Sequence, residues 1–302
     1  MLLDSIRTIR RLALCVAVIG GTWLFTAEVL GRIVDPVEAR QSYIAEDAMI
    51  SQVTFDERRF YDSIERTDSE DRIVDEDVKG AIIPHHALAS DLIADAFNQL
   101  RLSSDPKTIV VVGPNHEELG DSNAITSSLS WKMSNGTVNG DEFMRSSLRS
   151  QDLITEENDV VISEHSIGTL LPYVAHYFPE AQIVPIVLSS KHDVIQSNRL
   201  GEALVNDDTL VIASVDFSHY LSLEVANELD EITLDAIEGR DSALISQMNS
   251  DYLDSPPSLI TLFAAMDAAN ANDHTLLQHT NSAVIEDKEV ASTTSYFTIL
   301  FH

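Results

Sequence analysis

Residues 109–116 read IVVVGPNH, a continuous Val/Ile run that ends in a glycine, a proline and a polar pair. Four consecutive branched apolar residues are typical of a strand buried on both faces, as in a parallel sheet covered by helices. The polar pair places Asn115 and His116 directly after that strand. The stretch therefore predicts a buried strand of an α/β sheet, with a histidine at the sheet edge where such folds bind ligands.

The same alternation of short apolar runs and helical periods continues on both sides of this strand. Further strands are predicted at residues 81–83, 183–188, 210–214 and 296–301, and helices at 91–100, 166–177, 194–205, 223–237 and 258–271. Alternating strands and helices are typical of a layered α/β domain. We therefore predict a single domain over residues 78–302, with a largely parallel or mixed sheet flanked by helices.

Two more of these strands end in polar groups that contain histidine. His85 and His86 follow the strand at 81–83, and Asp216 and His219 follow the strand at 210–214. Imidazole is a common metal ligand and carries protons near neutral pH. A lone histidine at a strand end is more often a structural hydrogen-bonding group, and Asp216 could cap the next helix. Three such strand ends in one domain nevertheless favour a shared functional site.

A further cluster, Glu164-His165-Ser166, has a local explanation. Ser166 can cap the helix predicted to begin there, and an acid near a helix N-terminus interacts favourably with the helix dipole. On spacing alone we prefer this structural interpretation. The remaining histidines are assigned no function: His176, His192, His274, His279 and His302.

The composition excludes several classes of function. The chain carries 49 Asp and Glu against 19 Lys and Arg, a formal net charge of −30. So acidic a surface repels nucleic-acid phosphates, which argues against DNA or RNA binding. The single cysteine, Cys15, lies outside the predicted domain, which excludes intrachain disulfides and a thiol nucleophile there. Catalysis must therefore use oxygen or nitrogen groups, or a metal.

The N-terminal segment is expected to be a membrane anchor. Arg7, Arg10 and Arg11 precede an apolar run over residues 12–27, slightly shorter than the roughly 20 residues of a spanning helix. A cleaved signal peptide is the alternative, but no small-x-small cleavage site follows the run. We expect residues 1–33 to form an uncleaved single-pass anchor with its arginines in the cytoplasm and the domain outside. Residues 34–77 are expected to form an acidic stalk.

Five motifs follow one another along the predicted domain: PHHA at 84–87, GPNH at 113–116, EHSI at 164–167 with LPY at 171–173, FPEAQIVPI at 178–186, and DFSH at 216–219. The set resembles the Memo-like proteins, called AmmeMemoRadiSam system protein B in prokaryotes. The resemblance runs from about residue 79 to the end, and its most specific part is 164–186. It implies the fold of the class III extradiol ring-cleaving dioxygenases, which use a non-haem Fe(II) site.

The resemblance also implies roles for individual residues. His85 and His116 match two metal ligands of the family. Asp216 and His219 match a pair that lines the same pocket, and we expect His219, oriented by Asp216, to act as an acid/base. Around them, His86, Glu164 and His165 are expected to support the metal or line the pocket.

The chain departs from the family at a third ligand. Memo-like proteins usually supply a cysteine before a late helix, whereas residues 252–258 read YLDSPPS, with Asp254 at or near that position. As a ligand, Asp254 would complete a set of two histidines and one carboxylate, which Fe(II) favours and which also suits Zn(II) or Mn(II). The alternative is that Asp254 only caps the following helix and the metal site is degraded. His86 replaces a small residue and could add a ligand, and Gly168 stands where the family often has Glu.

Three functions stay open at this point. The first is a metal-dependent oxidoreductase of the dioxygenase type, acting on an unidentified small molecule. The second is metal-assisted hydrolysis, with His219 as base. The third is a non-catalytic metal-binding or partner-binding protein, tied to a radical-SAM partner as the family's prokaryotic name implies. An exported domain conflicts with direct contact to a cytosolic iron–sulfur enzyme. A serine hydrolase is poorly supported because no Gly-x-Ser-x-Gly elbow is present.

Overall fold

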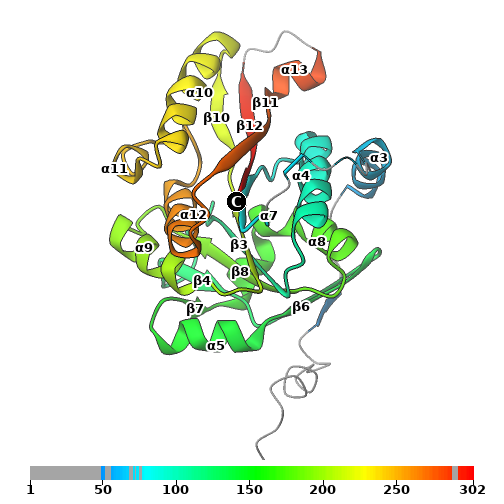
Figure 1. Cartoon of the computed structure of the whole chain (residues 1–302), viewed down its shortest axis with the longest axis vertical. Helices are drawn as coiled ribbons and strands as arrows, with labels where there is room; N and C mark the ends of the chain where they lie inside the picture. Colours follow the sequence, from blue (N-terminus) through cyan, green and yellow to red (C-terminus); the bar gives the residue numbers. More distant parts are fainter. Residues whose placement is uncertain (1–48, 52–55, 68–70, 72, 75–76, 288–291) are drawn as a thin grey trace, which may run out of the picture. The chain divides into compact units, whose positions relative to one another are not determined.

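A mixed β-sheet with helices on both faces forms the centre of the fold in the computed structural model (Figure 1). The structure describes residues 49–51, 56–67, 71, 73–74, 77–287 and 292–302. All of these belong to one contact unit, Ala45–His302. The prediction of a single α/β domain is therefore confirmed for the described residues.

The strand order of the sheet is β1-β5-β6-β8-β3-β9-β2-β12-β10. The run from β6 to β2 is parallel, whereas β12 pairs antiparallel with β2, β10 and β11. The strands are β1 Met49–Ser51, β2 Gly80–Ile83, β3 Thr108–Pro114, β4 Ala124–Thr126, β5 Ser130–Met133, β6 Gly136–Gly140, β7 Thr155–Glu156, β8 Gln182–Leu188, β9 Thr209–Ser214, β10 Phe217–Leu221, β11 His274–Asn281 and β12 Thr293–Phe301. The sheet is thus mixed, with a parallel centre.

Helices cover the two faces of this sheet and bury its alternate side chains. On one face, α4 and α8 pack their Phe97 and Val174 into a core with Val111 of β3. On the other face, Leu200 of α9 and several apolar residues of α12 pack with Val110. The helices are α3 Glu57–Thr67, the short 3-10 helix η2 Ala87–Ala89, α4 Ser90–Ser103, α5 Glu142–Ser150, α6 Asn158–Ser163, α7 His165–Gly168, α8 Leu171–Tyr177, α9 Val194–Ala203, α10 Leu223–Glu238, α11 Ser242–Ile245, α12 Pro256–Ala269 and α13 Ser282–Glu286.

The helix predicted over residues 166–177 is two helices in the structure. The first, α7, ends at Gly168, and α8 begins at Leu171 with Pro172 in its first turn. Proline is accommodated there because the first N–H groups of a helix have no intrahelical acceptor. The break allows α7 to sit at the end of β3 while α8 covers the sheet.

Helix α3 lies in the segment that was expected to form a stalk, but it packs against the domain. Phe60 is buried, and its ring lies 4.9 Å from that of Tyr173, measured between centroids. Arg66 donates hydrogen bonds to Asp91 at the start of α4. The bounds of the anchor at 1–33, the stalk at 34–77 and the domain at 78–302 stay predictions.

The expectation of a membrane-spanning helix is corrected. Across the described part of the chain, no helix is both long enough and apolar enough to cross a bilayer. The segment on which the expectation rested, residues 1–33, lies outside the described residues. The fold class is therefore given without a transmembrane helix, and neither the single-pass topology nor an extracytoplasmic location is carried further.

Helices α9 and α12 approach closely at Gly201. A Cβ atom at this position would lie 2.3 Å from the carbonyl oxygen of Thr261 and 2.9 Å from the amide nitrogen of Ala265. We expect Gly201→Ala to lower the free energy of unfolding by roughly 1–3 kcal/mol, because backbone atoms must move apart to admit the methyl group. This decrease is the net effect, which already includes the roughly 1 kcal/mol that alanine gains in helix propensity.

Urea denaturation measures this effect, with Asn198→Ala on the exposed side of the same helix as the control. The control should change stability by no more than about 0.5 kcal/mol. A Gly201→Ala protein as stable as the wild type would show that the two helices are not in close contact here.

Candidate metal centre

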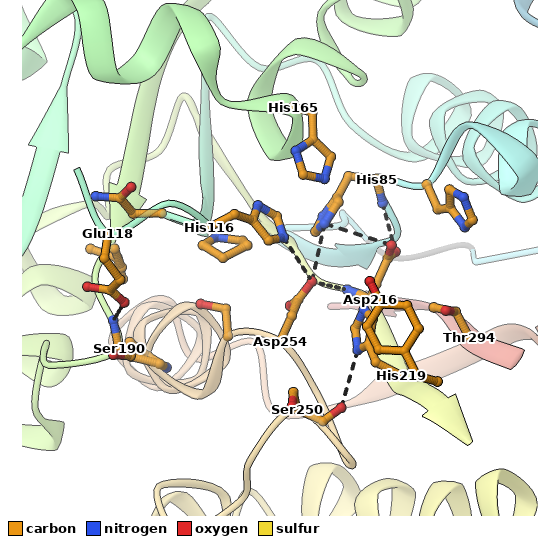
Figure 2. A pocket seen from close by; sticks show the side chains of 17 residues that line it. His85, His116, Glu118, His165, Ser190, Asp216, His219, Ser250, Asp254 and Thr294 are labelled. Carbon is orange, nitrogen blue, oxygen red and sulfur yellow. Dashed lines mark hydrogen bonds and ion pairs between the residues drawn. The ribbon is translucent and has the colours of Figure 1, made fainter. Parts of the chain in front are cut away.

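The ends of three strands meet at one pocket, as Figure 2 shows. His85 follows β2, His116 follows β3 and Asp216 follows β9, while Asp254 arrives from the loop before α12. The pocket has a volume of about 500 Å³. Its lining residues are His85, His86, Pro114, Asn115, His116, Glu118, His165, Leu188, Ser190, Asp216, His219, Tyr220, Ser250, Asp254, Ser255, Pro257 and Thr294. All the strand-end residues named from the sequence therefore reach one cavity.

Asp254 lies between the two histidines expected to bind metal. Its Oδ2 is 3.2 Å from Nε2 of His85 and 3.8 Å from Nε2 of His116. Backbone hydrogen bonds to Asp216 fix this position: the Asp216 amide donates to Asp254 Oδ2 at 3.2 Å, and the Asp254 amide donates to the Asp216 carbonyl at 3.1 Å. Asp254 thus contacts both imidazoles, although His85, His116 and Asp254 are not one of the sets of described residues whose ligand atoms all lie within 4.8 Å of one another.

The alternative role for Asp254, as the cap of the following helix, does not match the structure. The cap of α12 is Ser255, whose hydroxyl accepts a hydrogen bond from the Ser258 amide. The second oxygen of Asp254, Oδ1, is buried and has no hydrogen-bond partner among the described residues. Because an unpaired buried carboxylate oxygen is costly, this atom is suited to binding a cation.

The imidazole of His116 is held by Glu164. Nδ1 of His116 lies 2.7 Å from Glu164 Oε1, and the His116 amide donates to Oε2 at 2.9 Å. A carboxylate accepts hydrogen bonds, so we assign the proton to Nδ1, which leaves Nε2 without one when the ring is neutral. Glu164 reaches His116 because α7 sits tightly on β3: a Cβ at Gly113 would lie 2.7 Å from Ser166 Oγ.

A serine orients the other imidazole. Nδ1 of His85 lies 3.1 Å from Ser214 Oγ, and Ser214 donates its own proton to the Ser166 carbonyl at 2.6 Å. Ser214 must therefore accept from His85, which again assigns the proton to Nδ1 and leaves Nε2 as the free lone pair. Both histidines present the same nitrogen to Asp254, in the tautomer that a metal ligand requires.

The acids around the cluster shift its pKa values. Burial disfavours a charged imidazole at His116, but hydrogen bonds to Asp254 and Glu164 and the charges of these carboxylates raise its pKa to about 10. Burial likewise opposes protonation of His85, yet the charges of Asp216 and Asp254 raise its pKa. Although burial favours the neutral carboxyl, contact with His116 lowers the pKa of Glu164 to about 2. The site therefore concentrates negative charge that stabilises either protons on the imidazoles or a cation in their place.

His165 and Asp216 also lie close enough to His85, His116 and Asp254 to be metal ligands. The ring of His165 stacks on that of His116 at 4.2 Å between centroids, and its Nδ1 lies 3.3 Å from Glu164 Oε1. Within the described residues, two sets of three can place one ligand atom each within 4.8 Å of the others: His85, His116 and His165, and His85, Asp216 and Asp254. His165 and Asp216 thus lie nearer to the centre than the sequence indicated.

The expected pairing of Asp216 with His219 is wrong. Oδ1 of Asp216 accepts a hydrogen bond from the His85 amide at 3.0 Å. Nδ1 of His219 lies 3.3 Å from the Ser250 carbonyl oxygen instead. Since a carbonyl oxygen can only accept, we assign the proton to Nδ1, and Nε2 of neutral His219 is free to accept one.

His86 lines the pocket but does not join the ligand cluster. Its Nδ1 lies 2.5 Å from the Tyr296 hydroxyl, and burial lowers its pKa. Among the described residues it belongs to neither candidate ligand set. The suggestion that it adds a ligand is not supported.

The sequence analysis missed several lining residues, notably Glu118, Ser190, Tyr220, Ser250 and Thr294. Ser190 follows β8, so the strand-end argument applied to the fourth parallel strand would have found it. Ser250 and Thr294 lie where no sequence pattern pointed to the pocket.

Comparisons with known proteins agree on a family. Residues 55–300 match the family model described as Memo-like protein. A MEMO1 family protein of Methanopyrus kandleri is 27% identical over 236 residues, which cover 74% of this chain and 82% of the relative. A MEMO1 family protein of Pyrobaculum aerophilum is 28% identical over 236 residues, covering 74% and 83%. The crystal structure of an uncharacterized Escherichia coli K12 protein aligns with a TM-score of 0.51 and 12% identity, over 74% of this chain and 100% of that chain, a likeness in fold alone.

Proposed function

The chain belongs to the Memo-like protein family, and from this premise we propose that it binds one divalent metal ion on His85, His116 and Asp254 and uses it to transform a small molecule. Two imidazoles and one carboxylate form the ligand set that non-haem Fe(II) favours, and Zn(II) or Mn(II) also suits it. We propose Fe(II) as the preferred ion, since carboxylate is a harder ligand than the cysteine the family usually has.

The observation that carries this proposal is that the Nε2 atoms of His85 and His116 both lie within 4 Å of the Asp254 carboxylate. Ligand atoms about 2.0–2.2 Å from one ion, at tetrahedral or octahedral angles, lie roughly 3–3.5 Å apart. The separations of 3.2 and 3.8 Å need only a small adjustment to reach that range. The unpaired Oδ1 of Asp254 and the two oriented imidazoles fit the same interpretation.

The residues around the ligands suit a reaction centre. A bound ion would supply Lewis acidity and, as Fe(II), redox chemistry with oxygen. Glu164 and Ser214 hold the imidazoles in orientation. Leu188, Pro114 and Pro257 also line the pocket, so part of its wall is apolar.

His219 is the group we propose for moving protons. It lines the same pocket, and its Nδ1 is engaged by the Ser250 carbonyl, which leaves Nε2 to accept a proton from a bound substrate. Imidazole is the side chain that most often transfers protons in enzymes. Hydrolysis and a non-catalytic role use the same metal site, and a radical-SAM partner stays a prediction from the family name.

Metal loading of the full chain, purified anaerobically, tests the proposal. We expect about one ion of Fe(II), Mn(II) or Zn(II) per chain by elemental analysis, and a large loss in His116→Ala. His274→Ala is the control because that histidine lies on β11, away from the pocket lining. A folded protein that retains no metal after reloading would overturn the metal site.

Oxygen uptake then separates the two enzymatic functions. Consumption of oxygen by the Fe(II)-loaded protein with phenolic substrates would favour the dioxygenase-like reaction. Metal-dependent cleavage of ester or amide substrates without oxygen uptake would favour hydrolysis.

A further inference from the structure

A buried acidic residue outside the candidate metal centre contacts the strand that carries His219. Asp230 of α10 is 0% exposed. Its Oδ1 accepts a hydrogen bond from Ser218 Oγ at 2.7 Å, and its Oδ2 lies 2.9 Å from His279 Nε2. A carboxylate this deeply buried is tolerated only with such partners. The metal site proposed above uses none of these three residues.

The backbone on both sides of His219 is strained. Ser218 has φ of 37° and Tyr220 has φ of 60°, in the left-handed region that residues other than glycine seldom adopt. The pairing of β10 with β12 shifts register between Phe217 and Leu221, so this stretch leaves the regular ladder. Such strain persists only where surrounding contacts hold it, and it concentrates at functional sites.

The strained stretch brings two side chains to the pocket. His219 and Tyr220 are neighbours in sequence, and both line it. In a regular strand, successive side chains point to opposite faces. A local bulge redirects a side chain, as bulges beside active sites often do. The left-handed turn is therefore what allows both residues to face the same cavity, with Tyr220 82% exposed at its rim.

We propose that Asp230 and His279 are positioning residues, which hold Ser218 in its left-handed conformation and so direct His219 and Tyr220 into the pocket. This inference rests on the proposed function for the role of His219. The chain of contacts runs from β11 through α10 to β10. In Figure 1, α10 lies beside β10, and β12 lies between β10 and β11.

Backbone hydrogen bonds of Ser218 and His219 indicate which part of β10 depends on Asp230. The Ser218 amide donates to the Tyr252 carbonyl at 3.0 Å, and the His219 amide donates to the Ser250 carbonyl at 3.2 Å. Both acceptors lie in the segment that leads to Asp254. Apolar packing of Phe217 on Phe297, at 4.5 Å between ring centroids, already anchors the start of β10. The polar contacts of Asp230 therefore act on the turn after Phe217.

The first test compares Asp230→Ala with Asp230→Asn in the full chain. Asparagine can still accept from Ser218 through its Oδ1, and its amide group can donate to Nε2 of His279 when that ring carries its proton on Nδ1, whereas alanine can do neither. We expect Asp230→Ala to shift the NMR resonance of the His219 ring and to speed hydrogen exchange at the His219 amide by at least about tenfold, because local opening becomes easier. Asp230→Asn should restore both readouts, and the rings of His85 and His116 should not shift.

The second test uses Ser218, because it separates the hydrogen bond from the strain. Ser218→Ala loses the bond to Asp230 and keeps a Cβ in the left-handed region. Ser218→Gly loses the bond but also relieves the strain, since glycine adopts positive φ readily. We expect the alanine variant to disturb the His219 ring and amide more than the glycine variant.

Two results would overturn the proposal. One is an Asp230→Ala protein with a lower melting temperature but an unchanged His219 ring and amide, which is the behaviour of a residue that only stabilises the fold. If Asp230→Ala does not fold, equal effects of the two Ser218 variants would overturn it. None of these readouts needs a metal, so this inference and the metal site can fail separately. A Zn(II) titration of each variant measures metal binding independently of the position of His219.

Discussion

Replacing Asp254 by alanine is expected to weaken the binding of a divalent metal ion by more than about 100-fold. Loss of a residue that merely orients a ligand typically costs 10–100-fold in metal affinity, and Asp254 is a proposed ligand itself. Its carboxylate lies within 4 Å of both imidazole Nε2 atoms, and its side chain is buried next to that of His85. Its loss removes one of three ligands and the negative charge nearest the ion. A competition titration with a chelating dye measures the change.

Asp251→Ala is the matched control, because Asp251 lies three residues away on an exposed turn. It should bind metal like the wild type. Asp254→Cys provides a second comparison: a thiolate is softer than a carboxylate, so the preference should move from Mn(II) towards Zn(II). Binding by Asp254→Ala within about threefold of the wild type would contradict the proposed ligand set. It would point to His85, His116 and His165, the other group of ligand atoms that lie close enough.

The central strands were predictable from the sequence because their burial leaves a plain pattern. All residues of β3 and β9 are buried. A strand that is covered on both faces usually has a nearly continuous run of apolar residues in its sequence. The C-terminal side of the sheet was harder. The strand β11 reads HTLLQHTN, is half-buried along most of its length and shifts register, so it has no clear period of two.

The site was predictable to the extent that it follows from topology. Strands that run parallel end at one edge, so the sequence alone was enough to group His85, His116 and Asp216. Glu164 shows the limit of this reasoning. It does act locally, but the sequence analysis expected Ser166 to be the cap, whereas Glu164 itself is the N-cap of α7 and accepts from the Ser166 amide. It also holds His116, 48 residues away, a contact that no local pattern contains.

The wrong partner for His219 has a conformational cause. Asp216 and His219 match a pair that lines the pocket in the family that the sequence resembles, and on that ground we expected Asp216 to orient His219. The left-handed backbone at Ser218 turns His219 towards Ser250, while Asp216 stays with the His85 amide. Positive φ at a serine leaves no mark in the sequence, since serine is common in every kind of turn.

Metal affinity is expected to rise with pH, by up to about 100-fold per pH unit where both imidazoles carry protons. The ion binds deprotonated Nε2, so each proton that it displaces adds about tenfold per unit. The pKa of His116 is raised to about 10 and that of His85 is also raised above its usual value, so protons compete with the ion at neutral pH. Asp254, whose pKa is lowered by its contacts with these histidines in spite of burial, stays ionised and adds nothing to the slope.

Calorimetry in buffers of different ionisation enthalpy counts the protons directly, and we expect between one and two to be released per Zn(II) bound at pH 7. Glu164→Gln is the informative variant, because it removes the negative charge by which Glu164 raises the pKa of His116 and leaves Nδ1 only a neutral amide oxygen as acceptor. With that pKa lower, fewer protons should be displaced, and the slope of affinity against pH should become shallower. An affinity that does not change between pH 6 and 8 would mean that the ion does not displace protons from His85 and His116. In that case the carboxylates of Asp254 and Glu164 would only stabilise the protonated imidazoles, and the metal would have to bind at another site.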